Sequence, residues 1–202
     1  MKVKNKFARI FLVRHGEVTN RKNIIYGYLP VPLSPKGKIQ ALKAGIFLKK
    51  KNIAAIFTSP QKRSQETAKI IKKAIGGKIK IITDKNLRES GFGFFTQGLT
   101  RLEAVKKYPK QCLIYNREPA KLKAGESLAE QVGRMLSVIN NEIKKYPGRN
   151  LVFVSHRDPI LAALLKISKR SFNDLHEVKY LCETGSVLEI DLIGRRLVNK
   201  NF

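Results

Sequence analysis

The chain has 202 residues, 43% of them hydrophobic, and a formal net charge of +26. This length and composition indicate one globular domain over residues 1–202 and exclude disordered and collagen-like chains. No apolar run approaches the roughly 20 residues that a membrane-spanning helix needs, so we expect no membrane partner. The basic start of the chain lacks the apolar run of a secretory signal, which favours a cytoplasmic protein.

The two cysteines, Cys112 and Cys182, are isolated in the sequence. Their spacing matches neither a disulfide framework nor a metal site, so we expect two free thiols in a reducing compartment. Cys182 in particular is expected to be a packing residue.

The positive charge is spread over several lysine clusters. These lie near the carboxyl ends of the predicted helices, at 49–51, 72–73, 106–107 and 144–145. Cations there complement the helix dipole and remain solvated. The chain has no tryptophan and no zinc-finger or RNA-binding signature, so we do not expect nucleic acid as a partner. No acidic residue lies between Glu17 and Glu66, which favours a positive field that steers anionic substrates.

Short apolar runs without a helical period predict the buried strands of a parallel sheet. There are four, at 10–13, 55–58, 79–83 and 151–154, and a later run at 187–192 predicts an edge strand. Helical patterns separate these runs. The alternation predicts an α/β fold, a three-layer sandwich with a mainly parallel central sheet flanked by helices.

Helix signals occupy the connections between the strands. Ser34-Pro35 predicts a helix start, and the apolar residues at 39, 42, 46 and 47 continue the helix to about Lys50. A second helix is expected over 63–74. The capping box at 127–130 opens the longest helix, whose apolar stripe is expected in the core, and a short apolar helix follows over 159–165. The segment 90–125, rich in glycine, proline and charge, is expected to form a lid.

Chemically active side chains follow the predicted strands. Arg14 and His15 follow the first strand, His156 follows the run at 151–154, and the other two strands lead to Arg63 and Glu89. Because ligands bind outside the carboxyl ends of strands in open α/β sheets, these side chains are expected to converge. Two imidazoles, two guanidiniums and a carboxylate at one sheet edge are typical of a phosphate-handling active site.

The motifs that carry these residues resemble those of the histidine phosphatase superfamily, the phosphoglycerate mutase-like enzymes. The resemblance rests on five segments, Arg14-His15-Gly16-Glu17, Ser59-Pro60-Gln61-Lys62-Arg63-Ser64-Gln65-Glu66-Thr67-Ala68, Leu87-Arg88-Glu89, Gly125-Glu126-Ser127 and Val154-Ser155-His156. It extends over about residues 8–192. It implies a phosphoglycerate mutase-like fold and an enzyme of the phosphatase type.

The resemblance also implies a role for each residue. His15 attacks phosphorus and forms a phosphohistidine, while Arg14 and Arg63 bind the phosphate and lower the pKa of His15. His156 donates a hydrogen bond to a phosphate oxygen. Glu89 protonates the leaving alkoxide and then deprotonates the attacking water. No metal or other cofactor is expected, because the arginines supply the positive charge.

Four further residues are candidates for binding phosphate or substrate. Asn20 corresponds to a phosphate-contacting asparagine of the family, and Tyr26 and Gly27 are expected to contact substrate. Most family members have glycine after the second histidine, where this chain has Arg157. Arg157 could bind a second anionic group of the substrate at the rim, or it could pair with Asp158 or Glu126.

The segment after Glu89 departs from the family pattern, because it is one residue longer and lacks the usual Trp-Glu-Gly. Arg88 is expected to be solvated or structural, and His176 to be a hydrogen-bonding residue outside the site.

The sequence thus predicts a metal-independent phosphomonoesterase acting on small anionic phosphometabolites. Two alternatives remain, a cofactor-dependent phosphoglycerate mutase and a basic nucleic-acid or anion-binding protein that retains the fold.

Overall fold

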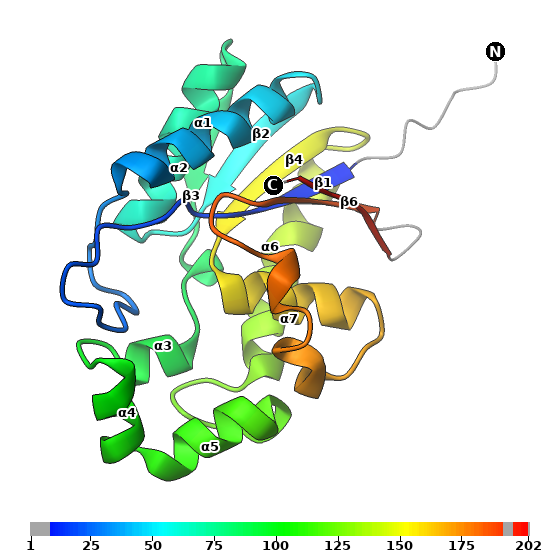
Figure 1. Ribbon diagram of the computed structural model, residues 1–202. Coiled ribbons are helices and arrows are strands. Elements are labelled where there is room, and N and C mark those ends of the chain that lie inside the picture. The colour runs from blue at the N-terminus through cyan, green and yellow to red at the C-terminus, as the bar shows by residue number, and fades with distance from the viewer. Residues whose placement is uncertain (1–8, 192–195, 202) are drawn as a thin grey trace.

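A computed structural model describes residues 9–191 and 196–201. Its centre is a six-stranded sheet in the order β3-β2-β4-β1-β5-β6 (Figure 1). The strands are β1 (Arg9–Arg14), β2 (Ile53–Thr58), β3 (Lys80–Thr83), β4 (Asn150–Ser155), β5 (Val187–Asp191) and β6 (Arg196–Asn201). The first four are parallel, and β5 and β6 are antiparallel to their neighbours. The expected mainly parallel α/β sandwich is confirmed.

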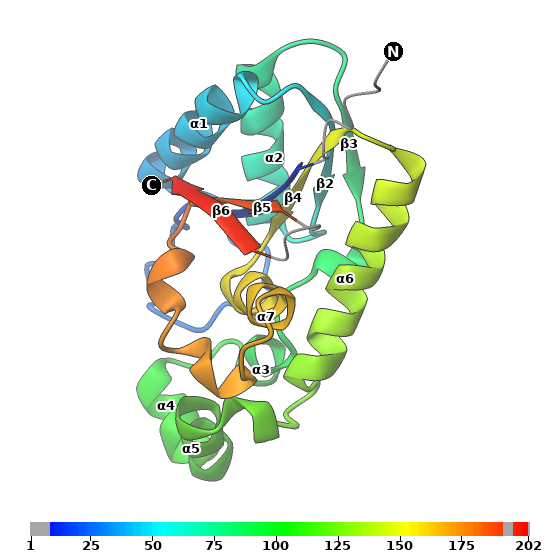
Figure 2. The same cartoon turned by 90° about the vertical axis from the view of Figure 1, so that its right-hand side faces the viewer.

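Helices cover both faces of the sheet (Figure 2). One face carries α1 (Pro35–Lys49) and α2 (Lys62–Ile75), and the other carries α6 (Leu128–Lys145) and α7 (Arg157–Ile167). Alternate residues of β1 point to opposite faces, so Ile10 and Leu12 join the core under α6 and α7, whereas Phe11 and Val13 join the core under α1 and α2.

The predicted lid segment folds as a helical layer with a small core of its own. It contains α3 (Gly91–Phe95), α4 (Arg101–Lys107), α5 (Pro109–Arg117) and the short turn η2 (Pro119–Lys121). Phe92, Cys112 and Leu122 are buried between these elements. Three other single-turn helices are η1 (Lys85–Leu87), η3 (Phe172–Leu175) and η4 (Lys179–Leu181). No helix of the described ranges is both long enough and apolar enough to cross a membrane.

The strand predicted at 187–192 does not lie at the edge of the sheet. It is β5, which lies between β1 and β6, and Leu192 falls outside the described residues. The strand at this edge of the sheet is β6, which the sequence pattern does not predict. Because β6 reads Arg-Leu-Val-Asn-Lys-Asn and is largely exposed, it lacks the apolar signal of a buried strand.

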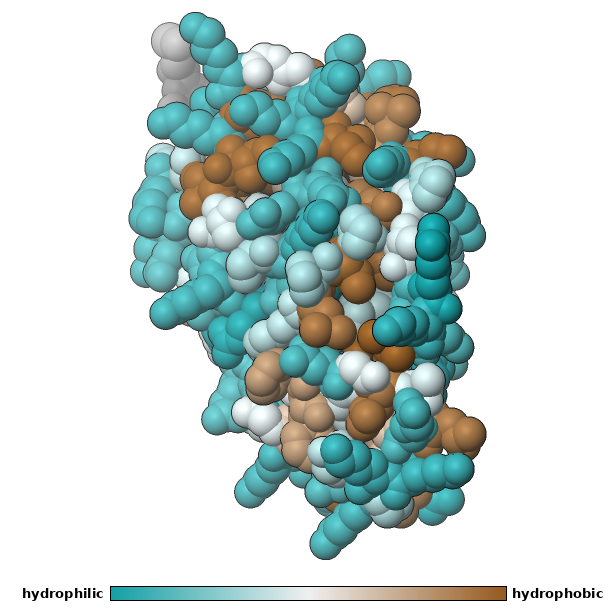
Figure 3. Space-filling model, turned by 90° about the vertical axis from the view of Figure 1, so that its left-hand side faces the viewer, coloured by the Kyte–Doolittle hydropathy of each residue, from teal (hydrophilic) through white to brown (hydrophobic). Residues whose placement is uncertain are grey.

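Helix α1 forms where predicted, but three of its large aliphatic side chains face outward. Ile39, Leu42 and Ile46 are 56%, 46% and 57% exposed. Apart from Leu48, the buried residues of the inner face are small, since α1 lies close to α2: a Cβ added at Gly45 would lie only 2.5 Å from Ala74 Cβ. On the face of the molecule that Figure 3 shows, hydrophobic areas lie among hydrophilic side chains.

Candidate active site

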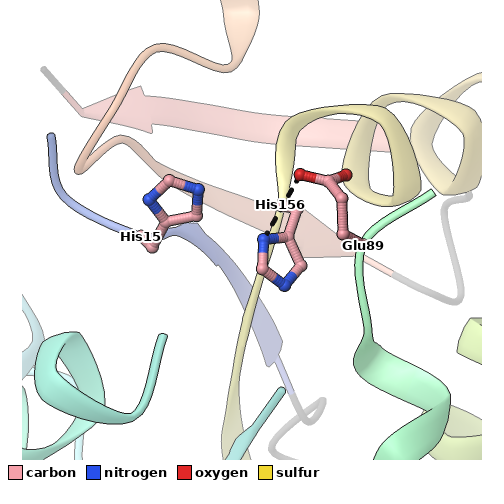
Figure 4. A group of neighbouring side chains, drawn as sticks. All are labelled: His15, Glu89 and His156. Atoms are coloured by element: carbon pink, nitrogen blue, oxygen red, sulfur yellow. Dashed lines mark ion pairs between the residues drawn. The ribbon is translucent and has the colours of Figure 1, made fainter. Parts of the chain in front are cut away.

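Two neighbouring parallel strands bring the two predicted histidines together. β1 and β4 run in register with Arg14 opposite Ser155, so His15 and His156 both follow at the carboxyl edge. Their ring centroids are 5.2 Å apart. Ligand atoms of these two rings and of the Glu89 carboxylate all lie within 4.8 Å of one another (Figure 4). The structure thus brings together residues that are far apart in the sequence.

The His15 ring is held in one tautomer. Its Nδ1 lies 2.7 Å from the carbonyl oxygen of Gly16, and since a carbonyl only accepts, Nδ1 carries the proton. The lone pair is therefore on Nε2, which lies 3.1 Å from Nε of Arg63. Burial lowers the pKa of His15 well below its usual range, and Arg63 and Arg14 lower this pKa further. His15 thus presents a neutral ring whose Nε2 lone pair accepts a hydrogen bond from Arg63 Nε.

The loop after His15 packs closely against the first turn of α1. A Cβ on Gly16 would lie 2.3 Å from the carbonyl oxygen of Gly37, so only glycine fits there. The Gly16 amide donates to Thr67 Oγ1 of α2 at 3.1 Å. The Arg-His-Gly motif therefore needs its glycine to fix the backbone that orients His15.

Arg63 occupies the centre of the cluster. It lies in the first turn of α2 and is fully buried. Its Nη2 donates to the carbonyl oxygen of Gly27 at 2.7 Å, lies 3.1 Å from His156 Nδ1 and forms an ion pair with Glu89 Oε2 at 3.5 Å. The Tyr26 ring lies 4.7 Å from the guanidinium carbon. Tyr26 and Gly27 thus contact Arg63, and their contact with substrate stays a prediction.

Two residues that the sequence analysis did not select orient His156. Its Nε2 lies 2.7 Å from Ser59 Oγ and 3.1 Å from Gln61 Oε1, and these two side chains are hydrogen-bonded to each other. Nδ1 therefore faces Arg63 and Glu89. Burial and then Arg63 lower the pKa of His156 well below its usual range. Both residues belong to the quoted Ser59–Ala68 motif, which was the signal available in the sequence.

Glu89 lies opposite His15, after η1. Its Oε1 accepts from the Ser90 amide at 2.9 Å, and its Oε2 lies 3.5 Å from His156 Nδ1. Burial raises the pKa of Glu89, and the charge of Arg63 opposes the rise. A carboxyl group with a raised pKa can hold the proton that an acid catalyst delivers.

Arg14 presents an unused donor beside this cluster. Its Nη1 donates to the carbonyl oxygen of Cys182 at 2.9 Å, whereas its buried Nε has no hydrogen-bond partner among the described residues. Buried donors are normally paired. A free guanidinium N–H next to a second arginine is suited to bind a phosphate oxygen.

The other two candidate residues, Asn20 and Arg157, are hydrogen-bonded to groups outside the histidine cluster. Asn20 exchanges two hydrogen bonds with the backbone of Ile24, at 2.8 and 3.2 Å, so its amide closes its own loop, and its role in phosphate binding stays a prediction. Arg157 Nε donates to Asp158 at 3.0 Å and its Nη2 donates to the Tyr115 hydroxyl at 3.0 Å. The structure therefore favours pairing with Asp158 over a free rim cation.

His176 and Arg88, which were expected to have no part in the chemistry, make structural hydrogen bonds. His176 Nε2 lies 2.7 Å from the carbonyl oxygen of Tyr115, outside the cluster. Arg88 bonds to the Tyr28 hydroxyl and to Glu126, and is structural. Cys112 and Cys182 are free and buried.

The histidine cluster has the composition of a metal site but is arranged around a guanidinium. Two imidazoles and a carboxylate could ligate a transition metal. The nitrogen lone pair of His15 and Nδ1 of His156 both face Arg63, as does the Glu89 carboxylate. The cation that these three side chains surround is therefore an arginine.

Comparison with known proteins agrees with this geometry. The family model of the histidine phosphatase superfamily (branch 1) matches residues 10–201. The chain belongs to the histidine phosphatase superfamily. It is 33% identical to the 2,3-bisphosphoglycerate-dependent phosphoglycerate mutase of Cytophaga hutchinsonii, over 84% of this chain and 81% of that one. It is 29% identical to a putative phosphoserine phosphatase 2 of Hydrogenobacter thermophilus, over 93% and 91% of the two chains.

Among solved structures, Bacillus stearothermophilus YhfR matches with a TM-score of 0.84 and 26% identity, over 94% of both chains. The expected fold and enzyme class are therefore confirmed: this histidine phosphatase has the phosphoglycerate mutase-like architecture of its relatives. Both mutases and phosphatases occur among those relatives. The side chains of the site therefore have to decide between a mutase and a phosphatase activity.

Proposed function

We propose that this histidine phosphatase is a phosphomonoesterase that hydrolyses small anionic phosphate esters through a phosphohistidine. The observation that carries the proposal is the state of His15, a buried neutral ring whose Nε2 lone pair faces Arg63 while Nδ1–H is held by Gly16. That arrangement is suited to in-line attack on a phosphorus atom bound between the two arginines.

The first step forms a bond between His15 Nε2 and phosphorus and breaks the bond from phosphorus to the ester oxygen. The proton of Glu89 passes to the departing oxygen, and Arg14 and Arg63 stabilise the charge on the transferring group. In the second step, water attacks phosphorus, its proton returns to Glu89, and the nitrogen–phosphorus bond breaks. The enzyme is restored with no net change in charge or protons.

We propose further that no metal ion takes part. The arginine side chains provide the positive charge that metal ions provide in other phosphoryl-transfer enzymes. Support comes from the central place of Arg63, which contacts His15, His156 and Glu89 at once.

Two observations favour hydrolysis over a mutase reaction. A mutase must hold the carboxylate of a phosphoglycerate while the phosphoryl group is returned to it. Arg157, the candidate for that contact, is paired with Asp158, and Arg88 is paired with Glu126. The lid also carries mainly lysines, which bind a carboxylate less specifically than the arginine fork.

A mutase activity is the second candidate, because this chain is 33% identical to a phosphoglycerate mutase. We expect p-nitrophenyl phosphate hydrolysis to continue undiminished in EDTA. With 3-phosphoglycerate and catalytic 2,3-bisphosphoglycerate, free phosphate should form faster than 2-phosphoglycerate, as followed by phosphorus NMR. Faster isomerisation would assign the protein as a mutase, and loss of activity in EDTA would contradict a metal-independent mechanism.

The charge of the protein gives a separate prediction. If the acid-free stretch between Glu17 and Glu66 attracts substrate, kcat/KM for a multiply charged phosphate should fall several-fold between about 0.1 and 1 M salt, as the Debye length shrinks from about 10 Å to 3 Å. kcat should stay constant. A flat response would show that the lysines do not steer substrate. Salt-sensitive DNA binding without phosphatase activity would favour the binding-protein alternative.

A further inference from the structure

The guanidinium of Arg134 on α6 is held by five acceptors in a site of its own, outside the histidine cluster. Nη1 donates to the carbonyl oxygens of Asn86 and Arg88 at 2.7 and 2.8 Å, and Nη2 donates to that of Glu89 at 3.0 Å. Nη2 and Nε bond to the two oxygens of the Glu126 carboxylate. All five N–H donors of the guanidinium are thus used, and the side chain is only 8% exposed.

The acceptors belong to the backbone segment that carries Glu89. Residues 88–90 form neither helix nor strand, so no ladder of hydrogen bonds fixes this segment. The Arg88 amide donates to the carbonyl oxygen of Lys85, and side chains hold the carbonyls of the segment, among them the Tyr28 hydroxyl, which donates to the carbonyl oxygen of Glu89 at 3.3 Å. Ser155, the residue before His156, donates to the carbonyl oxygen of Leu87 at 2.8 Å, and Arg134 binds the carbonyls on both sides of it. Four consecutive carbonyls, of residues 86–89, are therefore each held by a side chain.

The motif Gly125-Glu126-Ser127 supports this arrangement from the other side. Ser127 caps α6 and so fixes the helix that carries Arg134. Glu126 receives Arg134 through both of its oxygens and packs against Gly91, where an added Cβ would lie 2.5 Å from its own Cβ. The motif therefore places a bidentate carboxylate behind the guanidinium.

We infer that Arg134 is a positioning residue for the catalytic acid: its guanidinium sets the place of the Glu89 backbone and thereby the reach of its carboxyl group to the leaving oxygen. This inference rests on the proposed role of Glu89. A displacement of about 1 Å at a reacting group can cost about 10²-fold in rate. Loss of Arg134 should therefore impair the reaction step that needs the acid more than the steps that do not.

Two variants separate position from charge. Arg134→Lys keeps the positive charge but offers one ammonium in place of a planar fork. Arg134→Met removes the guanidinium altogether, and Glu126, which is only 9% exposed, keeps Arg88 as its ionic partner. Arg170→Met is the control, because Arg170 is an arginine whose ion pairs, to Asp174 and Glu177, involve no residue of the Glu89 segment.

The readout is kcat/KM for an alkyl phosphate and for p-nitrophenyl phosphate, whose leaving group needs little protonation. In both Arg134 variants we expect about 10–100-fold loss on the alkyl ester and at most a few-fold loss on the aryl ester. The Arg170 control should lose neither. In an Arg134→Ala variant, millimolar guanidinium should restore part of the alkyl-ester activity, since Arg134 itself lines a hollow of about 280 Å³ whose other lining residues are Asn86, Arg88, Gly125, Glu126 and Glu130.

Equal losses on the two esters, or no loss, would overturn the positioning role. So would failure of both Arg134 variants to fold, because that result would assign the arginine to the stability of the whole domain. A Glu89→Gln variant measured alongside shows whether only the positioning role of Arg134 fails or the acid role of Glu89 fails as well. If it discriminates between the esters and the Arg134 variants do not, only the positioning role fails. If it does not discriminate, the acid role of Glu89 fails as well.

Discussion

Replacing His15 by alanine is expected to lower phosphatase activity by at least about 10⁴-fold, because the proposed nucleophile, the Nε2 nitrogen whose lone pair faces Arg63, is removed. The variant should also lose acid-labile labelling by a radioactive phosphate ester. The fold should persist, since the polar partners of the ring are Gly16 and Arg63 and the strands on either side stay intact. Unfolding curves of the variant would establish this.

His176→Ala is the matched control for this experiment. His176 bonds to a lid carbonyl and does not contact His15, so its variant should still form an acid-labile phosphoenzyme. Labelling that survives in His15→Ala would show that another group is the nucleophile. Labelling lost in both variants would point to a general effect on the fold.

The parallel sheet and the convergence of the site were predictable from the sequence for one physical reason. A buried parallel strand needs a continuous apolar run, and the first polar residues after it must emerge at the carboxyl edge. Two such runs ending at Arg14-His15 and Ser155-His156 therefore determined both the fold and the meeting of two histidines. The antiparallel β6 carries no such signal, because it is polar and exposed.

The hydrogen bonds within the site were not predictable in the same way. A motif gives the residue type and its strand, but which of several partners a long side chain takes depends on distances of tenths of an ångström. Arg157 pairs with Asp158 rather than remaining free, and Asn20 closes its own loop. Arg134 is an extreme case, since its backbone acceptors have no sequence signature of any kind.

Glu89→Gln is the second variant with a large expected effect. The amide matches the carboxyl group in shape but cannot deliver a proton to an alkoxide, so kcat/KM for alkyl phosphates should fall by about 10²–10⁴-fold. kcat/KM for p-nitrophenyl phosphate should fall much less, because this ratio includes only the steps up to release of the first product. Hydrolysis of phosphohistidine also loses its base, so the phosphoenzyme should accumulate. Glu177→Gln, at an exposed ion pair, is the control.

The pH profile tests the same assignment independently. The pKa of His15 is lowered by burial and the arginines, so the neutral nucleophile persists as the pH falls below the usual histidine range, and the rising limb should lie there. The pKa of Glu89 is raised by burial, so the acid form persists above the usual glutamate range, and activity should fall as Glu89 loses its proton. With an alkyl phosphate as substrate, whose leaving group needs the acid, Glu89→Gln should remove the falling limb of kcat/KM and keep the rising one. A falling limb that is unchanged in this variant would mean that another group, or the substrate phosphate itself, provides it.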